Sequence, residues 1–423
     1  MTPMPTQPPS GRGPGTGPVP GPRRRNPSRG LGFAALAAFA AVSPLCTDIY
    51  TPAMPDVMRE FGTTPSAVQL TLTSFMIGLA VGHLLFGTLS DAMGRRRLLL
   101  IGGVVTVLAS VACALAPSIE VFIAARAVQG FAGADGVVLG RAIIADATVE
   151  PRTGRLLGLL TVIVGIAPVA APLLGAVLIQ GAGWRGVFWT VAGVLALVTA
   201  VAAWRVPETL APERRAGGGF RRIVAGIGTA LSRPLYRGLL VTFIFSFGAF
   251  FAYISASSFI LREQHGMGAL GFGASFAACA LAMTATSLFS SRAAGRIPYG
   301  RLIGIGLGGL AVAASVLFVA SLISTPLWLF LPACALLTAS MGLINPNLTA
   351  LALGQVRDVA GTGSALLGTC QFGIAAAVAP LVGLAGEHSS VPFGVCVLVP
   401  GLGAGAVYLA LARGRGERTT AVG

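Results

Sequence analysis

Hydrophobic residues in this chain fall into long runs that short polar segments separate. Twelve of these runs are about twenty residues long, which matches the roughly 30 Å hydrocarbon core of a bilayer. They predict membrane-spanning helices at residues 31–51, 68–88, 98–116, 120–144, 155–180 and 184–204, and then at 238–260, 272–291, 302–323, 326–350, 360–384 and 391–412. The pattern predicts an all-α membrane protein of twelve transmembrane helices in two halves of six.

Polar stretches set the domain organisation. Residues 1–30 are rich in Pro, Gly and Arg without apolar periodicity, which is typical of a disordered tail. A polar linker at 205–237 separates an N-terminal bundle (31–204) from a C-terminal bundle (238–412), and 413–423 form a second tail. The first apolar run is too long for a signal-peptide core, so we expect it to remain as a membrane helix.

The arginines predict the orientation of the chain. All 29 basic residues are arginine, and with the N-terminus inside, 24 of them fall in cytosolic tails and loops. Cytosolic loops of membrane proteins collect positive charge in this way. Arg59, Arg185 and Arg262 fall outside, and Arg126 and Arg141 lie within the fourth helix. We therefore expect a multi-pass protein of the cytoplasmic membrane with both termini in the cytosol.

Composition supports a lipid-embedded protein. Hydrophobic residues make up 54% of the chain, charged residues 10%, and the mean hydropathy is +0.82, whereas soluble domains carry about 25% charged residues. The net charge of +15 does not indicate nucleic acid binding, because the arginines are scattered between apolar segments. The six cysteines have neither paired nor metal-type spacing, so we expect no metal.

The loop after the second predicted helix has the most ordered polar sequence, Gly87-Thr-Leu-Ser-Asp-Ala-Met-Gly-Arg-Arg-Arg97. Topology alone would require only its positive charge. The string resembles the loop 2-3 signature of the major facilitator superfamily, G-x-L-S-D-x-x-G-R-R. That resemblance implies a polytopic transporter in which Gly87, Asp91, Gly94, Arg95 and Arg96 form a breakable latch.

The two halves share short repeats, which predicts pseudo-symmetry. Ser90-Asp-Ala-Met-Gly-Arg95 recurs as Ser291-Arg-Ala-Ala-Gly-Arg296, and Ala171-Pro-Leu-Leu-Gly175 recurs as Ala379-Pro-Leu-Val-Gly383. Chance could produce either match, but both have offsets of about two hundred residues and fall in equivalent helices. The second copy has lost the aspartate, so the latch is expected to be asymmetric.

Ionisable residues within the apolar runs are the first candidates for function, since each costs about 2.5 to 3.5 kcal/mol to place in a bilayer. Asp48 comes late in the first helix, where Pro52 and Pro55 would break the helix and open a turn toward a cavity. Alternatively, Asp48 is an interfacial residue that faces water.

Arg126 and Gln129 lie near the outer start of the fourth helix, three residues apart on one face. We expect a charged partner for Arg126, and Asp48 is the nearest acidic candidate; the alternative is that the arginine extends to the outer surface.

Two further ionisable groups are candidates for proton coupling. Asp135 lies near the bilayer middle, where burial favours its neutral form and an arginine would favour its charged form. His83 in the second helix can titrate near neutral pH. Alternatively, either residue is a neutral hydrogen-bonding group.

The fifth helix carries Gly165, Pro168, Pro172 and Gly175. Small residues and prolines allow close helix approach and bending, which would suit two halves that rock against each other. Loose packing alone would also explain them.

With these residues in view, the resemblance narrows to the bicyclomycin/chloramphenicol-resistance (Bcr/CflA) drug:proton antiporters. The motifs that carry it include Thr47-Asp-Ile-Tyr-Thr-Pro-Ala-Met-Pro55, Arg126-x-x-Gln-Gly130, Gly183-Trp-Arg-x-x-Phe-Trp189, Pro207-Glu-Thr-Leu210 and Phe251-Ala-Tyr-Ile-Ser-Ala-Ser257. Three positions depart from the family pattern, which usually has a small residue at Asp135, a glutamine at His83 and a proline at Ser258.

The resemblance implies export of a small amphipathic compound, with protons as the coupling ion and no other cofactor. Asp48 would be the coupling carboxylate, Arg126 the arginine of the fourth-helix motif, and Asp146 would complete the charge cluster with Arg95. The expected partners are the substrate, protons and the lipid bilayer, and the expected functional unit is a monomer.

Six residues are expected to line the substrate cavity, although ordinary helix packing would also explain them: Tyr50, Gln129, Phe251, Tyr253, Asn345 and Gln371.

Two other functions fit the same pattern. One is a metabolite facilitator, coupled to protons or uncoupled, and the other is a non-transporting membrane sensor. An enzyme is not expected, since the sequence shows no metal cluster, nucleophile triad or phosphate-binding glycine loop in the required context.

Overall fold

The computed structural model describes residues 31–148, 152–210, 219–323, 325–384 and 389–420. The N-terminal tail predicted at residues 1–30 lies outside this part of the chain. Within it, every regular element is helical, as predicted.

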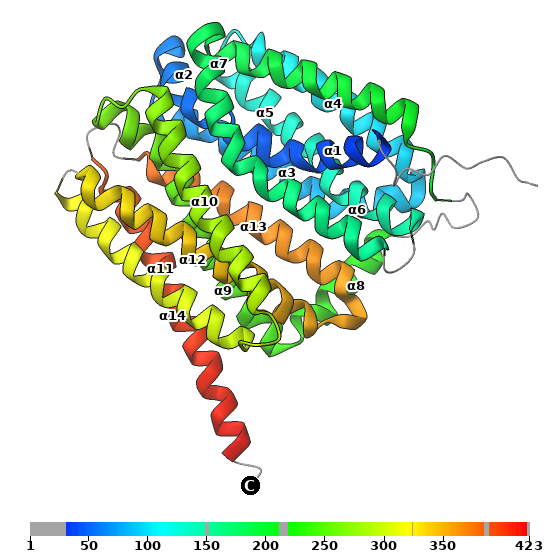
Figure 1. Cartoon of the computed structure of the whole chain (residues 1–423), viewed down its shortest axis with the longest axis vertical. Coiled ribbons are helices and arrows are strands. Elements are labelled where there is room, and N and C mark those ends of the chain that lie inside the picture. The colour runs from blue at the N-terminus through cyan, green and yellow to red at the C-terminus, as the bar shows by residue number, and fades with distance from the viewer. Residues whose placement is uncertain (1–30, 149–151, 211–218, 324, 385–388, 421–423) are drawn as a thin grey trace, which may run out of the picture.

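The helices form two halves joined by a linker (Figure 1). The N-terminal half contains α1 (Leu31–Asp48), η1 (Thr51–Ala53), α2 (Met54–Phe61), α3 (Pro65–Met93), α4 (Arg95–Ala114), α5 (Ile119–Gly133), α6 (Asp135–Ala147) and α7 (Arg152–Arg205). The linker carries α8 (Gly219–Leu231). The C-terminal half contains α9 (Pro234–Ser258), η3 (Phe259–Gln264), α10 (Ala269–Ala293), α11 (Tyr299–Leu322), α12 (Leu327–Gly354), η4 (Arg357–Val359), α13 (Ala360–Val382) and α14 (Val391–Thr420).

Helix α7 contains two membrane crossings. Eleven stretches of the described chain are long and apolar enough to span a bilayer, and one of them, Thr153–Arg205, has 53 residues. At 1.5 Å per residue it would be about 80 Å long, more than twice the hydrocarbon thickness. Gly183 interrupts it with a non-helical φ of 66°, and α7 turns back on itself in Figure 1. Counting two crossings here gives the predicted twelve.

Helix α1 ends where the prolines predicted a break, within the first candidate span, Leu31–Phe61. Helix α1 stops at Asp48, and Pro52 and Pro55 are then the second residues of η1 and α2. Proline is tolerated there because the first turn of a helix needs no backbone donor. The side chain at the end of α1 is thereby placed at a bend in the backbone.

Glycines allow helix backbones to approach closely within the N-terminal half. A Cβ atom at Gly130 would lie 2.1 Å from the Phe75 carbonyl oxygen, and one at Gly136 would lie 2.0 Å from the Phe39 carbonyl oxygen. These contacts join α5 to α3 and α6 to α1. Close backbone packing through small residues is the main source of helix association in lipid, where the hydrophobic effect between helices is weak.

Two helix pairs join the halves. Helix α3 packs against α13, and α7 packs against α10. In the second pair, a Cβ at Gly273 would lie 3.1 Å from the Pro172 carbonyl oxygen. The two halves therefore meet along two seams, with space between the seams for a cavity.

Replacing Gly130 with alanine should destabilise the protein, because the new methyl group would overlap the Phe75 carbonyl. Overpacking of this kind costs about 1–3 kcal/mol. Gly193→Ala is the matched control, since Gly193 is helical and a Cβ there meets nothing within 4 Å. Thermal unfolding in detergent should show a lower midpoint for Gly130→Ala only; equal midpoints for the two variants would contradict the packing argument.

Candidate functional site: a cavity between the halves

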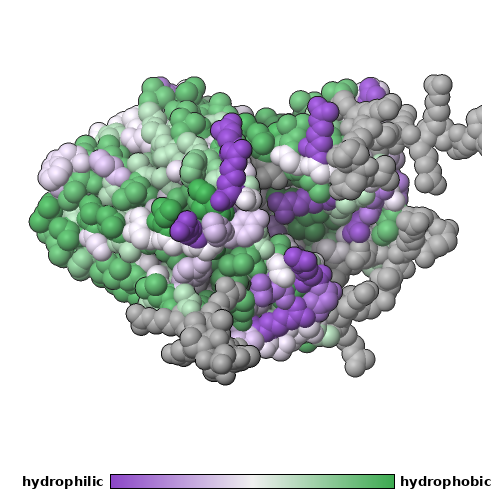
Figure 2. Space-filling model, turned by 60° about the horizontal axis from the view of Figure 1, so that its bottom comes forward, coloured by the Kyte–Doolittle hydropathy of each residue, from purple (hydrophilic) through white to green (hydrophobic). Residues whose placement is uncertain are grey.

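A cavity of about 940 Å³ lies between the two halves. Its walls come mainly from α1, α3, α6 and α7 on one side and from α9, α10, α12 and α13 on the other. Figure 2 shows a hollow in the surface with hydrophilic residues at its rim. The volume is at the upper end of the range for pockets that bury a drug-sized ligand.

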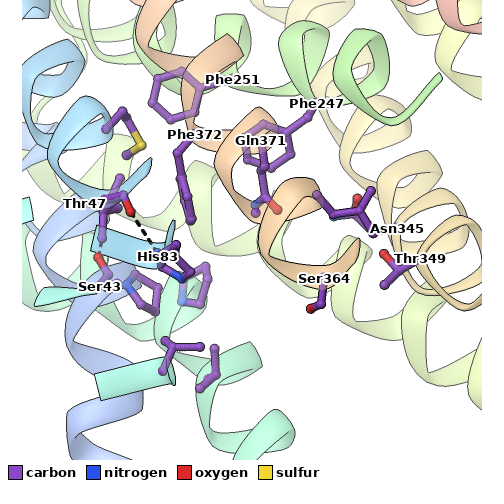
Figure 3. A pocket seen from close by; sticks show the side chains of 18 of the residues that line it. Ser43, Thr47, His83, Phe247, Phe251, Asn345, Thr349, Ser364, Gln371 and Phe372 are labelled. Carbon is purple, nitrogen blue, oxygen red and sulfur yellow. Dashed lines mark hydrogen bonds between the residues drawn. The ribbon is translucent and has the colours of Figure 1, made fainter. Parts of the chain in front are cut away.

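The C-terminal wall is aromatic with a few polar side chains. Its aromatic residues are Phe243, Phe247, Phe250, Phe251, Tyr253, Phe276 and Phe372. In Figure 3, Asn345, Thr349, Ser364 and Gln371 lie across the cavity from Ser43, Thr47 and His83. Four predicted lining residues, Phe251, Tyr253, Asn345 and Gln371, do face this cavity. The combination suits a ligand that has both apolar surface and polar groups.

Asp48 supplies a carboxylate to the N-terminal wall. The residue is only 5% exposed, yet it lines the cavity at the last position of α1. Its backbone carbonyl accepts a hydrogen bond of 2.8 Å from the Thr51 hydroxyl, which fixes the bend at this point. In the described residues, the Asp48 carboxylate forms no ion pair. It is therefore available to a proton or to a ligand in the cavity.

Arg126 lies behind the cavity wall and does not pair with Asp48, contrary to the prediction. Its Nη1 donates to the Cys46 carbonyl oxygen at 3.1 Å and to Gln129 Oε1 at 2.7 Å. The guanidinium lies 4.1 Å from the ring centroid of Phe75 and 5.2 Å from that of Tyr50. Carbonyl, amide and aromatic groups thus take the place of a carboxylate around this buried cation.

Tyr50 and Gln129 were predicted to line the cavity, and both predictions are wrong in this conformation. The Tyr50 hydroxyl lies 3.1 Å from Thr71 Oγ1. Gln129 Nε2 donates to Ser110 Oγ at 2.8 Å. Both side chains are fully buried and belong to the polar network around Arg126.

Asp135 also faces away from the cavity. It begins α6, is 1% exposed, and has a carboxyl oxygen, Oδ2, without a hydrogen-bond partner among the described residues. A Cβ at Gly102 would lie 2.0 Å from that oxygen, so the carboxyl group faces α4. Its position gives no support to a direct role in the cavity.

His83 does line the cavity, at the contact between α3 and α13. Its Nδ1 lies 3.0 Å from the Leu79 carbonyl oxygen, one helical turn earlier. The imidazole ring lies 5.0 Å from the ring of Phe372, measured between centroids. The histidine therefore has a local hydrogen-bond partner and a packing role across the seam between the halves.

The predicted latch forms a cluster at the end of the molecule that carries α8. Arg95 Nε lies 3.1 Å from Asp146 Oδ2, and the Arg95 guanidinium also donates to Ser90 Oγ. The backbone N–H of Arg95 donates to Glu208 Oε1 at 3.0 Å. Gly94, with a φ of 95°, makes the turn between α3 and α4 that positions these groups.

This cluster ties together elements of the N-terminal half only. Arg96 Nε donates to the Val206 carbonyl oxygen at 2.8 Å, which joins α4 to the end of α7. Gly87 and Arg95 line the mouth of the cavity, and the side chain of Asp91 lies outside the described part of the structure. In this conformation, the described latch contacts do not bridge the two halves.

A second ion cluster, at the α2 end, does bridge the halves. Arg262 Nη1 lies 2.7 Å from Asp56 Oδ2, and Arg59 Nη1 lies 3.7 Å from Glu263 Oε1. Asp56 and Arg59 belong to α2, whereas Arg262 and Glu263 belong to η3. None of these four residues is among the predicted site residues. The sequence does contain a signal for this cluster. Arg59 and Arg262, two of the three arginines on the expected outer side, are each followed directly by a glutamate.

Hydrogen bonds between the halves also lie toward the α2 end. Gln69 Nε2 donates to the Ser255 carbonyl oxygen at 3.4 Å, and Thr73 Oγ1 donates to the Ala376 carbonyl oxygen at 3.0 Å. Gln69 and Thr73 lie in the first third of α3, and the cavity lining extends along the rest of that helix to Gly87. The cavity is thus closed at the α2 end and reaches the α8 end.

The small residues of the first part of α7 have different surroundings. Pro168 lines the cavity, Pro172 contacts Gly273 of α10, and a Cβ at Gly175 would lie 2.0 Å from the Ile49 carbonyl oxygen. A Cβ at Gly165 would meet nothing within 4 Å. Three of the four residues therefore lie at the cavity or at close helix contacts. These are positions at which the two halves are expected to move against each other.

Comparison with known proteins shows the class of this protein. Residues 36–380 match the family model of the Major Facilitator Superfamily, and the chain belongs to this family of transporters. A solved bacterial homologue of the human lysosomal transporter Spinster, in an inward-facing and occupied conformation, has the same fold: the TM-score is 0.70 at 17% identity, over 92% of this chain and 97% of that one.

Two relatives agree with the narrower resemblance that the motifs predicted, a resemblance to bacterial drug-resistance transporters. The chain is 32% identical over 366 residues to the uncharacterised MFS-type transporter YdgK of Bacillus subtilis, covering 86% of this chain and 91% of that one. It is 27% identical over 368 residues to a bicyclomycin resistance protein homologue of Haemophilus influenzae, covering 86% and 92%.

Removing the Asp56 carboxylate should open the α2 end. Asp56→Asn weakens the contact with Arg262, and losing a charge-assisted hydrogen bond should raise the open population roughly tenfold. Cysteine introduced at Ser255, which is fully buried beneath this cluster, reports opening through its rate of reaction with a thiol reagent, corrected for the native cysteines.

Glu60→Gln is the matched control for this variant. Glu60 pairs with Arg185 at 2.8 Å, and both residues lie in the N-terminal half. The control should leave the labelling rate unchanged. A similar increase in both variants, or in neither, would show that the Asp56–Arg262 contact does not hold the α2 end closed.

Proposed function

We propose that this protein exports small amphipathic compounds, including antibiotics, across the cytoplasmic membrane in exchange for protons. The observation that carries the proposal is the position of Asp48, an unpaired carboxylate among aromatic side chains in a cavity that reaches only one end of the molecule. The name of the relative from Haemophilus influenzae, a bicyclomycin resistance protein homologue, supports this substrate class. Because one chain forms the whole cavity, a monomer suffices.

In the proposed orientation the α8 end faces the cytosol. Most arginines of the chain lie in the tails and loops that this assignment places inside, in agreement with the positive-inside rule. The cavity then opens inward, and the Asp56–Arg262 cluster closes the outer side. Substrate would enter from the cytosol and meet the aromatic wall.

The exchange follows from competition between substrate and proton. Substrate binding near Asp48 would displace its proton toward the cytosol, and breaking the contacts at the α2 end while the α8 end closes would expose the cavity to the outside. After the substrate leaves, a proton from the outer side would neutralise Asp48 again. Coupling requires that each ligand favour a different state of the transporter.

The α7–α10 and α3–α13 seams are the surfaces on which the halves would rock. Pro168 and Pro172 in α7 give the first seam a helix that can bend. The Arg95–Asp146 cluster would stabilise the α3–α4 turn and release it when the α8 end closes.

Asp48→Asn should abolish proton release on substrate binding. The amide cannot titrate, whereas Asp135→Asn should retain the signal because Asp135 faces α4. We would add bicyclomycin and chloramphenicol to the purified protein in weakly buffered detergent solution and record the pH change together with binding.

Binding without proton release in the wild-type protein would support a facilitator that is not coupled to protons. Release that survives in Asp48→Asn but disappears in Asp135→Asn would move the coupling site to the α4–α6 contact.

A further inference from the structure

The cavity contains a second unpaired charge, the guanidinium of Arg141. Arg141 lies on α6, lines the cavity, and is exposed to it. In the described part of the chain, no carboxylate lies within ion-pair distance of its guanidinium. Arg95, which also lines the cavity, is paired with Asp146, so Arg141 differs from the other arginine at this site.

Asp48 and Arg141 line the cavity at different depths. Helix α1 runs antiparallel to α5 and α6, since the Ser43 hydroxyl donates to the Gly133 carbonyl oxygen and Gly136 packs on Phe39. In this register, Asp48 and Arg141 are separated by about 13 residues, or about 19 Å along the helix axis between their Cα atoms. Because Cβ atoms tilt toward a helix N-terminus, the Arg141 side chain starts in the direction of Asp48.

The wall of the cavity opposite these charges, in the C-terminal half, is mainly aromatic, and Ser43, Thr47 and His83 are polar residues on the same side as the charges. Phe247, Phe250 and Phe251 line the C-terminal wall, and Asn345 and Gln371 are the amides on that side. Asn345 Oδ1 is a buried acceptor without a hydrogen-bond partner among the described residues. The cavity therefore offers an anion, an extended aromatic surface, neutral amides and a cation.

Topology alone does not explain Arg141. The positive-inside rule concerns loops and helix ends, whereas Arg141 lies six residues into α6 and faces the cavity from within a spanning segment. The exposure of Arg141 within the cavity lowers the cost of placing a charge in a spanning segment. An arginine also presents a planar fork that binds a carboxylate through two hydrogen bonds.

We propose that the preferred substrates are elongated aromatic zwitterions, with a carboxylate on Arg141 and a cationic amine near Asp48. This proposal rests on the export function above and specifies its substrate class. The amine end displaces the proton of Asp48, and the acid end orients the molecule without taking part in coupling. An anion alone would lack the group that competes with the proton.

A matched set of three probes tests the two charges separately. Ciprofloxacin is an aromatic zwitterion, its methyl ester keeps only the amine charge, and its N-acetyl derivative keeps only the carboxylate. We would measure their binding to the purified full-length protein by calorimetry, for the wild type, Arg141→Gln and Asp48→Asn.

Arg141→Gln should lower the binding affinity for the zwitterion and for the N-acetyl derivative roughly tenfold or more, which is the loss expected when a charge-assisted hydrogen bond is removed. The affinity for the ester should not change. Asp48→Asn should lower the binding affinity for the zwitterion and the ester and leave the affinity for the N-acetyl derivative unchanged. Arg141→Lys should recover part of the lost affinity. Arg237→Gln, which removes an exposed arginine of α9 outside the cavity lining, is the control.

The proposal fails if the wild type binds the ester as tightly as the zwitterion, if Arg141→Gln weakens all three probes alike or none, or if no probe binds. Proton release on ester binding distinguishes these failures from failure of the export function. The ester keeps the amine, so it should release a proton whether or not Arg141 recognises the acid. If one of the failures above occurs while the ester, or bicyclomycin where no probe binds, still releases a proton, antiport stands and zwitterion recognition is wrong.

Discussion

The contact between Asp56 and Arg262 is the interaction on which the state of this molecule depends. It joins α2 to η3 across the boundary between the halves, at the end where Gln69 and Thr73 of α3 also donate hydrogen bonds to α9 and α13. Charged groups at a partly buried site attract each other more strongly than in bulk water, so this cluster can hold one end closed while the other remains open. Which end is closed decides where the described part of the cavity opens and, in the proposed exchange, from which side a proton would reach Asp48.

The N-terminal half contains two kinds of charged residue within its membrane-spanning helices: one enclosed by other protein groups and one facing the cavity. Arg126 is enclosed by a carbonyl, an amide and aromatic rings, which makes it part of the framework in this conformation. Asp48 and Arg141 face the cavity without partners in the described chain, which makes them available to ligands. Moving a charge across the membrane is worth about 2.3 kcal/mol per 100 mV, so a group that is neutralised in one state and charged in the other can couple the potential to transport.

Sequence predicted the fold in detail because each signal was local. The lengths of the apolar runs gave the twelve crossings, and the gap between the fifth and sixth runs fell at Gly183, where α7 breaks. Pro52 and Pro55 placed the end of the first helix beside Asp48. The family match also follows from short motifs that can be read along the chain.

The arrangement of the site was harder to predict, because it depends on helix rotation. Helices that are apolar on all sides carry little information about which face meets a cavity. For this reason Tyr50 and Gln129 were assigned to the lining, and Arg126 was paired with Asp48. Contacts between distant segments, such as Arg95 with Glu208 and Asp56 with Arg262, leave no periodic signal at all.

Transport against a concentration gradient tests the central claim most directly. Proteoliposomes containing the full-length protein, with the lumen more acidic than the medium, would be supplied with labelled bicyclomycin in the medium, and its concentration in the lumen would be followed until it reaches or exceeds that of the medium. Proton exchange predicts accumulation in the lumen that collapses when a protonophore dissipates the pH gradient. Equilibration without accumulation, at the same rate with and without the gradient, would contradict the account and identify a facilitator.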